Sequence, residues 1–121
     1  MKRRLELQSG MNNILTLDNP KDYRCRVTGY LLERSLLVVE ASHETQTFYV
    51  IFPEIQYFDG PFLWHGASLR TASRDEQFEY MLDKSVATLG MLYIFDGRDA
   101  AIHLLCGDWI AIFDNLPARF K

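Results

Sequence analysis

The sequence predicts an α+β fold that is rich in β-structure: a curled antiparallel sheet of about six or seven strands, a meander or partial barrel, with one amphipathic helix packed on it. Two observations predict this class. Short runs of aromatic and β-branched residues recur between clusters of turn residues, which is typical of antiparallel strands. A single segment, residues 73–84, combines a helix-capping pattern with apolar residues three and four positions apart.

Length and composition indicate one folded domain. The chain has 121 residues, of which 48% are hydrophobic and 24% are charged, and these values are near the average of globular proteins. A second methionine, Met11, follows Ser9 and Gly10. We therefore expect residues 1–10 to be a flexible N-terminal extension and residues 11–121 to form a single α+β domain.

The first half of the chain is expected to supply strands at Tyr23–Leu32, Leu36–Ala41, Thr47–Phe52, Glu54–Phe58 and Phe62–Leu69. Side chains in the first run alternate between two sides, which is typical of a half-buried strand. The third run has aromatic or branched residues throughout, so both of its faces are apolar and it is expected to be a central strand. Pro53 is expected to end that strand because it has no backbone donor.

The helix is expected to begin after Ser73. Ser73 and Glu76 have the spacing of a capping box, and Asp75 lies in the first turn, where a negative charge is favourable. The apolar stripe that would pack on the sheet consists of Phe78, Met81 and Leu82. An extension of the helix to a capping Gly90 stays open, because the β-branched residues in this stretch are poorer helix formers.

The last third is expected to form a three-stranded meander of Met91–Phe95, Ala101–Cys106 and Trp109–Phe113. A hairpin turn at Gly107-Asp108 would pair Cys106 with Trp109, Leu104 with Ala111 and Ile102 with Phe113. Both faces of this hairpin are apolar, so something covers each side. We expect the helix on one side and a curled or second sheet on the other. The alternative is a homodimer, or a protein partner bound to an apolar sheet face.

Charge and cysteine content narrow the class of partner. The formal charge of -3 and the isoelectric point near 5.5 argue against a nucleic-acid partner, and the basic cluster at residues 2–4 is expected to be a solvated tail. No apolar run approaches the ~18 residues of a membrane helix, so no membrane partner is expected. Cys25 and Cys106 form no redox motif, which favours a cytoplasmic protein with reduced thiols, while one disulfide between them stays open.

The sequence carries no motif for catalysis or for metal binding. His43, His65 and His103 are isolated from one another, and no nucleophile, P-loop or dinucleotide pattern occurs. We therefore expect no metal and no cofactor, and we favour a protein that is not an enzyme. His43 is expected at the surface and His103 in the core or an interface. An enzyme that uses His65 with Asp59, or His103 with Asp108, is the third interpretation.

The most unusual stretch is residues 57–66, where aromatic side chains crowd around a turn that also carries one carboxylate and one imidazole. Core packing is the first explanation of such a hairpin. The same residue types also suit a contact with a protein partner or a ligand pocket. The candidate binding residues are Tyr57, Phe58, Asp59, Phe62, Trp64, His65 and Trp109.

Two functions are compatible with these features. The first is a non-enzymatic protein-interaction module, such as an accessory, inhibitor or immunity-type protein, because negative charge and surplus apolar sheet surface occur without catalytic motifs. The predicted helix carries four acidic residues: Asp75, Glu76, Glu79 and Asp83. They form either a patch that suits a basic partner or a solvated helix face. The alternative is a small-ligand-binding sheet or partial barrel with an aromatic-lined pocket formed by residues 49–65.

Overall fold

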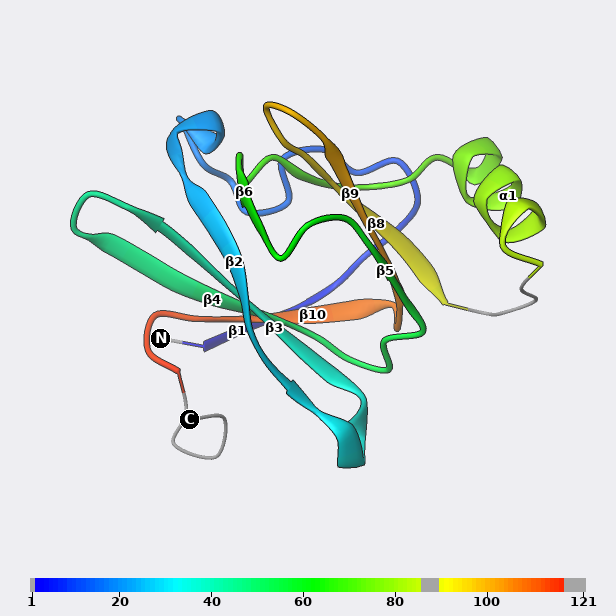
Figure 1. Cartoon of the computed structure of the whole chain (residues 1–121), viewed down its shortest axis with the longest axis horizontal. Coiled ribbons are helices and arrows are strands. Elements are labelled where there is room, and N and C mark those ends of the chain that lie inside the picture. The colour runs from blue at the N-terminus through cyan, green and yellow to red at the C-terminus, as the bar shows by residue number, and fades with distance from the viewer. Residues whose placement is uncertain (1, 86–89, 117–121) are drawn as a thin grey trace.

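In the described residues, ten strands form two antiparallel sheets, and one α-helix lies beside them (Figure 1). The computed structural model describes residues 2–85 and 90–116. The six-stranded sheet has the order β1 (Lys2–Glu6), β10 (Trp109–Phe113), β4 (Gln46–Phe52), β3 (Leu36–His43), β2 (Arg24–Leu31) and β6 (Leu63–His65). The four-stranded sheet has the order β5 (Tyr57–Asp59), β9 (Ala101–Cys106), β8 (Met91–Asp96) and β7 (Leu69–Thr71).

The predicted class, a β-rich α+β fold with one helix, is confirmed. The predicted curled sheet of six or seven strands is corrected to two sheets, because the chain divides its strands between two layers. The helix α1 spans Arg74–Asp83, and two 3-10 turns, η1 (Pro20–Asp22) and η2 (Leu32–Arg34), precede β2 and β3. No helix within these described ranges is long and apolar enough to cross a lipid bilayer.

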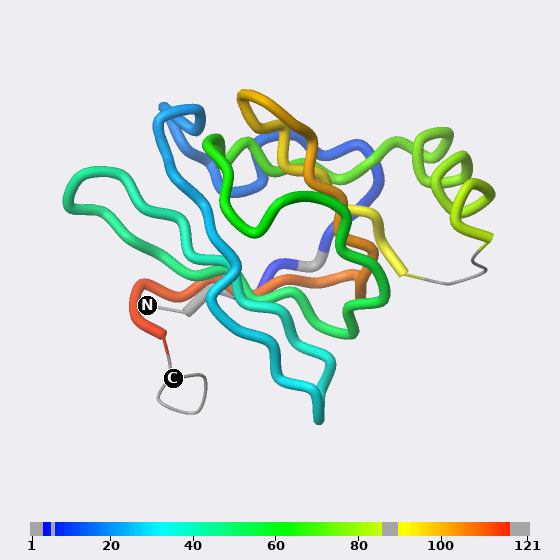
Figure 2. Tube along the Cα trace, in the orientation of Figure 1, coloured from blue at the N-terminus to red at the C-terminus, as the bar shows by residue number. Residues whose placement is uncertain are grey.

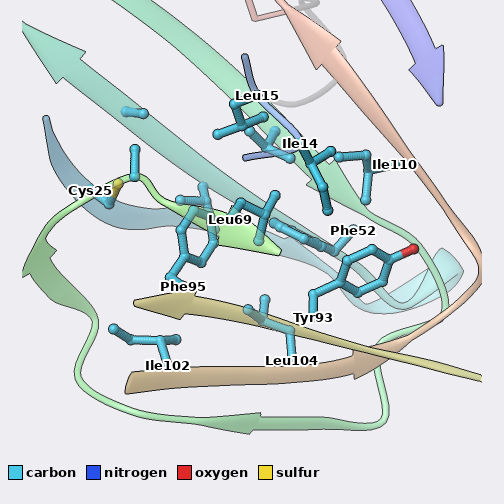
Figure 3. Close-up of a cluster of buried hydrophobic side chains, with 14 of the residues drawn as sticks. Ile14, Leu15, Cys25, Phe52, Leu69, Tyr93, Phe95, Ile102, Leu104 and Ile110 are labelled. Atoms are coloured by element: carbon cyan, nitrogen blue, oxygen red, sulfur yellow. The ribbon is translucent and has the colours of Figure 1, made fainter. Parts of the chain in front are cut away.

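The main core lies between the two sheets (Figure 3). Alternation along each strand directs every second side chain into this space. Its large members are Val39, Val50, Phe52 and Ile110 from the six-stranded sheet and Leu69, Tyr93, Phe95, Ile102 and Leu104 from the four-stranded sheet. The ring centroid of Phe52 lies 5.6 Å from that of Tyr93 and 6.1 Å from that of Phe95, and both contacts are edge-to-face. Each sheet therefore buries its inner face against the other.

The expected hairpin between β9 and β10 is not formed, because the two strands belong to different sheets. The Gly107 amide donates to the Pro53 carbonyl at 2.9 Å, and the Leu7 amide donates to the Asp108 carbonyl at 3.1 Å. These contacts make Gly107-Asp108 a corner in place of a hairpin turn, so the three cross-strand pairs predicted for it do not occur. The corner lets both apolar faces of the last third find cover inside the chain.

The N-terminal residues also differ from expectation. A flexible extension was expected over residues 1–10, but β1 pairs antiparallel with β10 along its whole length. Leu7 is buried, and the Gly10 amide donates to the Ala72 carbonyl at 3.1 Å. The physical reason is that the edge of β10 carries apolar side chains and backbone N–H and C=O groups that need partners. The strand β1 covers this edge and pairs with these groups.

The outer face of the six-stranded sheet is covered by its own side chains. A second cluster of buried residues lies there, formed by Leu36, Val38, Ile51, Ala111 and Phe113. The half-buried side chains of Leu31, Tyr49, Trp109 and Leu116 pack against it. The Arg4 guanidinium lies 4.4 Å from the centre of the Trp109 ring, which shields that ring from water. Partner binding at this face stays a prediction.

The helix begins as predicted but presents a different face to the sheet. The Ser73 hydroxyl accepts from the Glu76 amide at 3.1 Å, and the Glu76 carboxylate accepts from the Ser73 amide at 2.9 Å, which completes the capping box. Phe78 and Leu82 of the predicted stripe point to solvent, with exposed fractions of 63% and 64%. The side chain that packs on the sheet is Tyr80. The helix ends at Asp83, and residues 86–89 of the expected extension lie outside the described residues.

Candidate functional site

The aromatic residues around the β5–β6 turn lie on a path from the surface into the core. Phe62 is 70% exposed, and its ring centroid lies 5.6 Å from that of half-buried Phe58. Phe58 is followed by Trp64, which is 6% exposed and lies 5.1 Å from Phe95. The Trp64 indole N–H donates to the Gly66 carbonyl at 3.0 Å. Phe58 and Trp64 thus pack as core aromatics.

The other predicted binding residues do not gather at one place. Tyr57 and His65 are exposed, on β5 of one sheet and β6 of the other. Trp109 lies on the outer face of the six-stranded sheet. Asp59 alone joins a polar cluster, and this cluster lies under α1 on the outer face of the four-stranded sheet.

Asp59 connects α1 to the sheet. It lies opposite His103 in the pairing of β5 with β9. The Tyr80 hydroxyl donates to its carboxylate, and the Lys84 ammonium lies 3.2 Å from the same oxygen. The hydrogen bond from Tyr80, together with Lys84, holds the pKa of Asp59 below its ordinary value despite partial burial. Asp59 is therefore an ionised anchor for the second half of the helix.

Tyr80 and His103 form a stacked pair beneath the helix. Their ring centroids lie 5.3 Å apart with an interplanar angle of 10°. Burial and the hydrogen bond to Asp59 raise the pKa of Tyr80, so its hydroxyl stays a donor at neutral pH. His103 is half-buried, and its place beneath the helix comes from the outward alternation of β9.

Arg70 anchors the first turn of α1. Its guanidinium Nε lies 2.8 Å from the Asp96 carboxylate, and its two terminal nitrogens lie 2.8 and 3.1 Å from the two Glu76 oxygens. The bidentate Arg70 contact and the capping hydrogen bond lower the pKa of Glu76 to about 2. The hydrogen bonds of Arg70 with Glu76 and with Asp96 raise the pKa of Arg70. Both ends of the helix are thus attached to the sheet by charged groups.

A pocket of about 440 Å³ lies between α1 and the outer face of the four-stranded sheet. Figure 2 shows the helix standing at the side of this sheet, away from the six-stranded one. The helix supplies Glu76, Glu79, Tyr80 and Asp83 to the pocket, and the sheet supplies Leu92, Ile94 and His103. The lining therefore combines carboxylates, two stacked rings and an apolar floor.

The two acid–base pairs considered for an enzyme are not brought together as assumed. Asp59 faces α1 from the four-stranded sheet, whereas His65 lies on β6 of the six-stranded sheet. Asp108 lies at the β9–β10 corner, and the carboxylate across the strands from His103 is Asp59. In residues 2–85 and 90–116, no group of three or more His, Cys, Asp or Glu side chains could hold a metal ion.

The two cysteines are buried free thiols. Burial raises the pKa of Cys25 to about 12 and raises that of Cys106 well above its ordinary value. A thiol that stays protonated is a poor nucleophile and a poor metal ligand. Both residues therefore act as small core side chains.

Sequence reasoning missed Tyr80, which packs on the sheet, donates a hydrogen bond to Asp59 and stacks on His103. The spacing of the residues could have identified Tyr80 as a docked residue. It lies one helical turn after Glu76 and one turn before Lys84, and both of these are bound to partners on the sheet. The face that carries these three residues is the docked face of α1.

Replacing Glu76 by glutamine is expected to lower the free energy of unfolding by about 0.5–1 kcal/mol at neutral pH. Glutamine keeps the capping hydrogen bond and loses only the ion pair, which solvent screens because the Glu76 side chain is 43% exposed. The folded-state pKa of about 2 is below the ordinary value of 4.5, so the charge stabilises the fold above pH 4.5. This contribution is lost as the pH falls toward 2.

Urea unfolding of both proteins between neutral pH and about pH 2 measures this effect. The stability difference between wild type and Glu76→Gln is expected to shrink to near zero at the acidic end. The matched control is Glu79→Gln, one turn away on the same helix and without an arginine partner among the described residues. A Glu76→Gln difference that does not change with pH would contradict the assignment.

Two features of the structure are accessible to a partner: the exposed apolar pair on α1 and the pocket beneath the helix. The chain matches no protein-family model, no curated protein and no solved structure.

Proposed function

We propose that the chain is a non-enzymatic protein-interaction module that binds a basic protein partner through the outer face of α1, defined as Phe78 and Leu82 with the flanking Asp75 and Glu79. The observation that carries the proposal is the exposure of the apolar pair, 63% for Phe78 and 64% for Leu82. The two residues are four positions apart, so their side chains are neighbours on one side of the helix.

Exposure of this pair has an energetic cost that a partner would remove. No residue of α1 is fully buried, and the helix is docked through Tyr80 and through hydrogen bonds of Gln77 with Gly90 and Leu92. Burying a large apolar side chain contributes about 1.5–3 kcal/mol. Two such residues at the centre of an interface have the properties of binding hot spots.

The charges around the pair favour a basic partner. Asp75, Glu79 and Asp83 follow one another at successive turns of the helix. Among the described residues none of the three forms an ion pair, while the nearby Arg70 and Lys84 are bound to other carboxylates. A second copy of this chain would bring equal negative charges together. Charge complementarity therefore supports a different protein with a cationic surface.

The experiment compares capture of partners by immobilised wild type, by the double variant Phe78→Ala/Leu82→Ala, and by Phe62→Ala, from lysate of the cells that encode the chain. We expect wild type to retain one stoichiometric partner with a basic surface, and to retain it less at high salt. The double variant is expected to lose about 100-fold or more in affinity, because two hot-spot side chains are removed. Phe62→Ala, which removes an equally exposed ring elsewhere, is expected to bind normally.

The double variant is also expected to fold normally. Both positions are exposed, and alanine is a better helix former than phenylalanine, so the free energy of unfolding should change by less than about 0.5 kcal/mol. Equal retention of the same proteins by wild type and double variant would contradict the proposal. A wild-type chain that stays a clean monomer and retains no partner would contradict it as well.

The alternative function, a small-ligand-binding sheet with an aromatic pocket in residues 49–65, has weaker support. It requires a cavity at Trp64 or Tyr57. Trp64 packs against Phe95, and Tyr57 is exposed on the edge strand β5. The pocket beneath α1 is formed by other residues.

A further inference from the structure

We infer that the pocket beneath α1 binds the guanidinium group of an arginine side chain, which the partner inserts when it docks on Phe78 and Leu82. This inference rests on the proposed function and names the chemical group that the partner supplies. The pocket, of about 440 Å³, falls in the range of sites that hold small groups. Its lining selects the kind of group by charge, by shape and by position.

The charge of the lining selects a cation. No lysine or arginine of the described chain lines the pocket, and the carboxylates of Glu76, Glu79 and Asp83 do. Glu76 is already paired with Arg70, whereas Glu79 and Asp83 lie four positions apart with no ion-pair partner in residues 2–85 and 90–116. Two like charges at this spacing repel each other, and a cation placed between them relieves the repulsion.

The shape of the lining selects a flat cation with an apolar stem. Tyr80 and His103 present stacked planar rings, and Leu92 and Ile94 form an apolar floor. A guanidinium group stacks on aromatic rings and binds carboxylates through parallel hydrogen bonds, while its aliphatic stem packs on apolar surface. An ammonium group is more strongly hydrated and has no plane to stack.

The pocket is held open by bonds of its own walls. The hydrogen bond from Tyr80 to Asp59 fixes the ring in its place, and the bidentate contact of Arg70 fixes the first turn of the helix. A binding group that is already held in its bound position loses less entropy on binding. The ring of Tyr80 is therefore a fixed wall of the pocket, and the Lys84 ammonium already lies over it, 5.6 Å from its centroid.

The position of the pocket connects it to the docking surface. Successive residues of a helix are separated by 100° (3.6 per turn), so Glu79 and Asp83 lie between the side of Leu82 and the side of Tyr80. A partner seated on Phe78 and Leu82 therefore lies next to the carboxylates at the pocket entrance. An arginine side chain at the edge of that partner reaches the pocket across Glu79 and Asp83.

The test uses small probes, so that it does not depend on finding the partner. N-acetylarginine amide is titrated into the ¹⁵N-labelled full chain at low ionic strength, with the lysine analogue and the uncharged citrulline analogue as matched probes. We expect the arginine probe to shift the amide signals of Tyr80, His103 and Asp83 with a Kd of about 1–10 mM. The lysine probe is expected to bind at least about 5-fold more weakly, because it has no planar fork, and the citrulline probe is expected not to bind.

The double variant Glu79→Gln/Asp83→Asn is expected to weaken the arginine probe by about 10-fold or more, whereas the control Asp75→Asn, on the same helix and outside the pocket, leaves it unchanged. No shift at the pocket signals, or equal binding of arginine and citrulline probes, would overturn the inference. Equal binding of the lysine probe would overturn the assignment to guanidinium.

A second measurement identifies the source of the group. Glu79→Gln/Asp83→Asn is expected to reduce partner retention by about 10-fold or more in the capture experiment, if the arginine belongs to the partner. Probe binding with unchanged partner retention would overturn the assignment of the group to the partner. If the wild-type chain does not bind the arginine probe while partner retention still depends on Phe78 and Leu82, this inference is overturned and the proposed function stands.

Discussion

Replacing Phe95 by alanine is expected to lower the free energy of unfolding by about 3–5 kcal/mol. Phe95 is fully buried between the two sheets, where its ring centroid lies 5.1 Å from that of Trp64 and 6.1 Å from that of Phe52. Alanine would leave a cavity bordered by side chains from both sheets, and the strands cannot collapse around it without separating from their partners. Denaturant unfolding followed by tryptophan fluorescence measures the loss.

The matched control is Phe62→Ala, the same substitution at a ring that is 70% exposed. The Phe62 ring contacts Phe58 and is mostly exposed, so its removal is expected to cost less than about 1 kcal/mol. Equal costs at the two positions would mean that the space between the sheets is not the main core of the protein. A large cost at Phe95 alone supports the two-layer arrangement.

Replacing Gly66 by alanine is expected to lower the free energy of unfolding by about 2–4 kcal/mol. Its φ of +117° is a conformation that residues with a side chain rarely adopt. An added Cβ would lie 3.1 Å from both the Asp96 carbonyl oxygen and the Gly97 Cα, which are backbone atoms and cannot turn aside. The Gly66 carbonyl also accepts the Trp64 indole N–H, so a shift here would disturb the core.

Gly10→Ala separates the two causes. Gly10 also has a positive φ, of +79°, but an added Cβ would meet no atom within 4 Å. Its expected cost of about 1–2 kcal/mol is backbone strain alone. Gly29→Ala, with open space and no positive φ, is expected to change stability by less than about 1 kcal/mol. If Gly66→Ala cost no more than Gly10→Ala, the close approach of the backbone at Gly66 would be refuted.

Local features of the fold could be predicted from the sequence. The helix begins after Ser73 because its cap is made by residues three positions apart, and β9 occupies the range that apolar residues and turns indicated. The partners of each strand could not be predicted in the same way. Gly107-Asp108 has the composition of a hairpin turn, but Pro53 and Leu7, distant in the sequence, bind it as a corner. Such contacts depend on the assembled sheets.

The candidate site was only partly predictable for the same reason. Periodicity identified Phe78, Met81 and Leu82 as an apolar stripe, and a stripe on a lone helix was expected to face the sheet. The sheet surface beside α1 carries the cross-strand row Asp59, His103, Ile94 and Arg70, and the polar members of this row lie under the opposite side of the helix. Only the register of four strands brings these three residues together, and no local pattern in the sequence contains that register.

The central claim is that Phe78 faces outward and contacts a basic partner. The most direct test is photo-crosslinking from Phe78→p-benzoylphenylalanine in the full chain, with Phe62→p-benzoylphenylalanine as the control at another exposed ring. We expect a crosslink from position 78 to a basic protein, absent from position 62 and absent when Leu82→Ala is added. Crosslinks from position 78 only to residues of this chain would contradict it, because Phe78 would then lie against its own sheet.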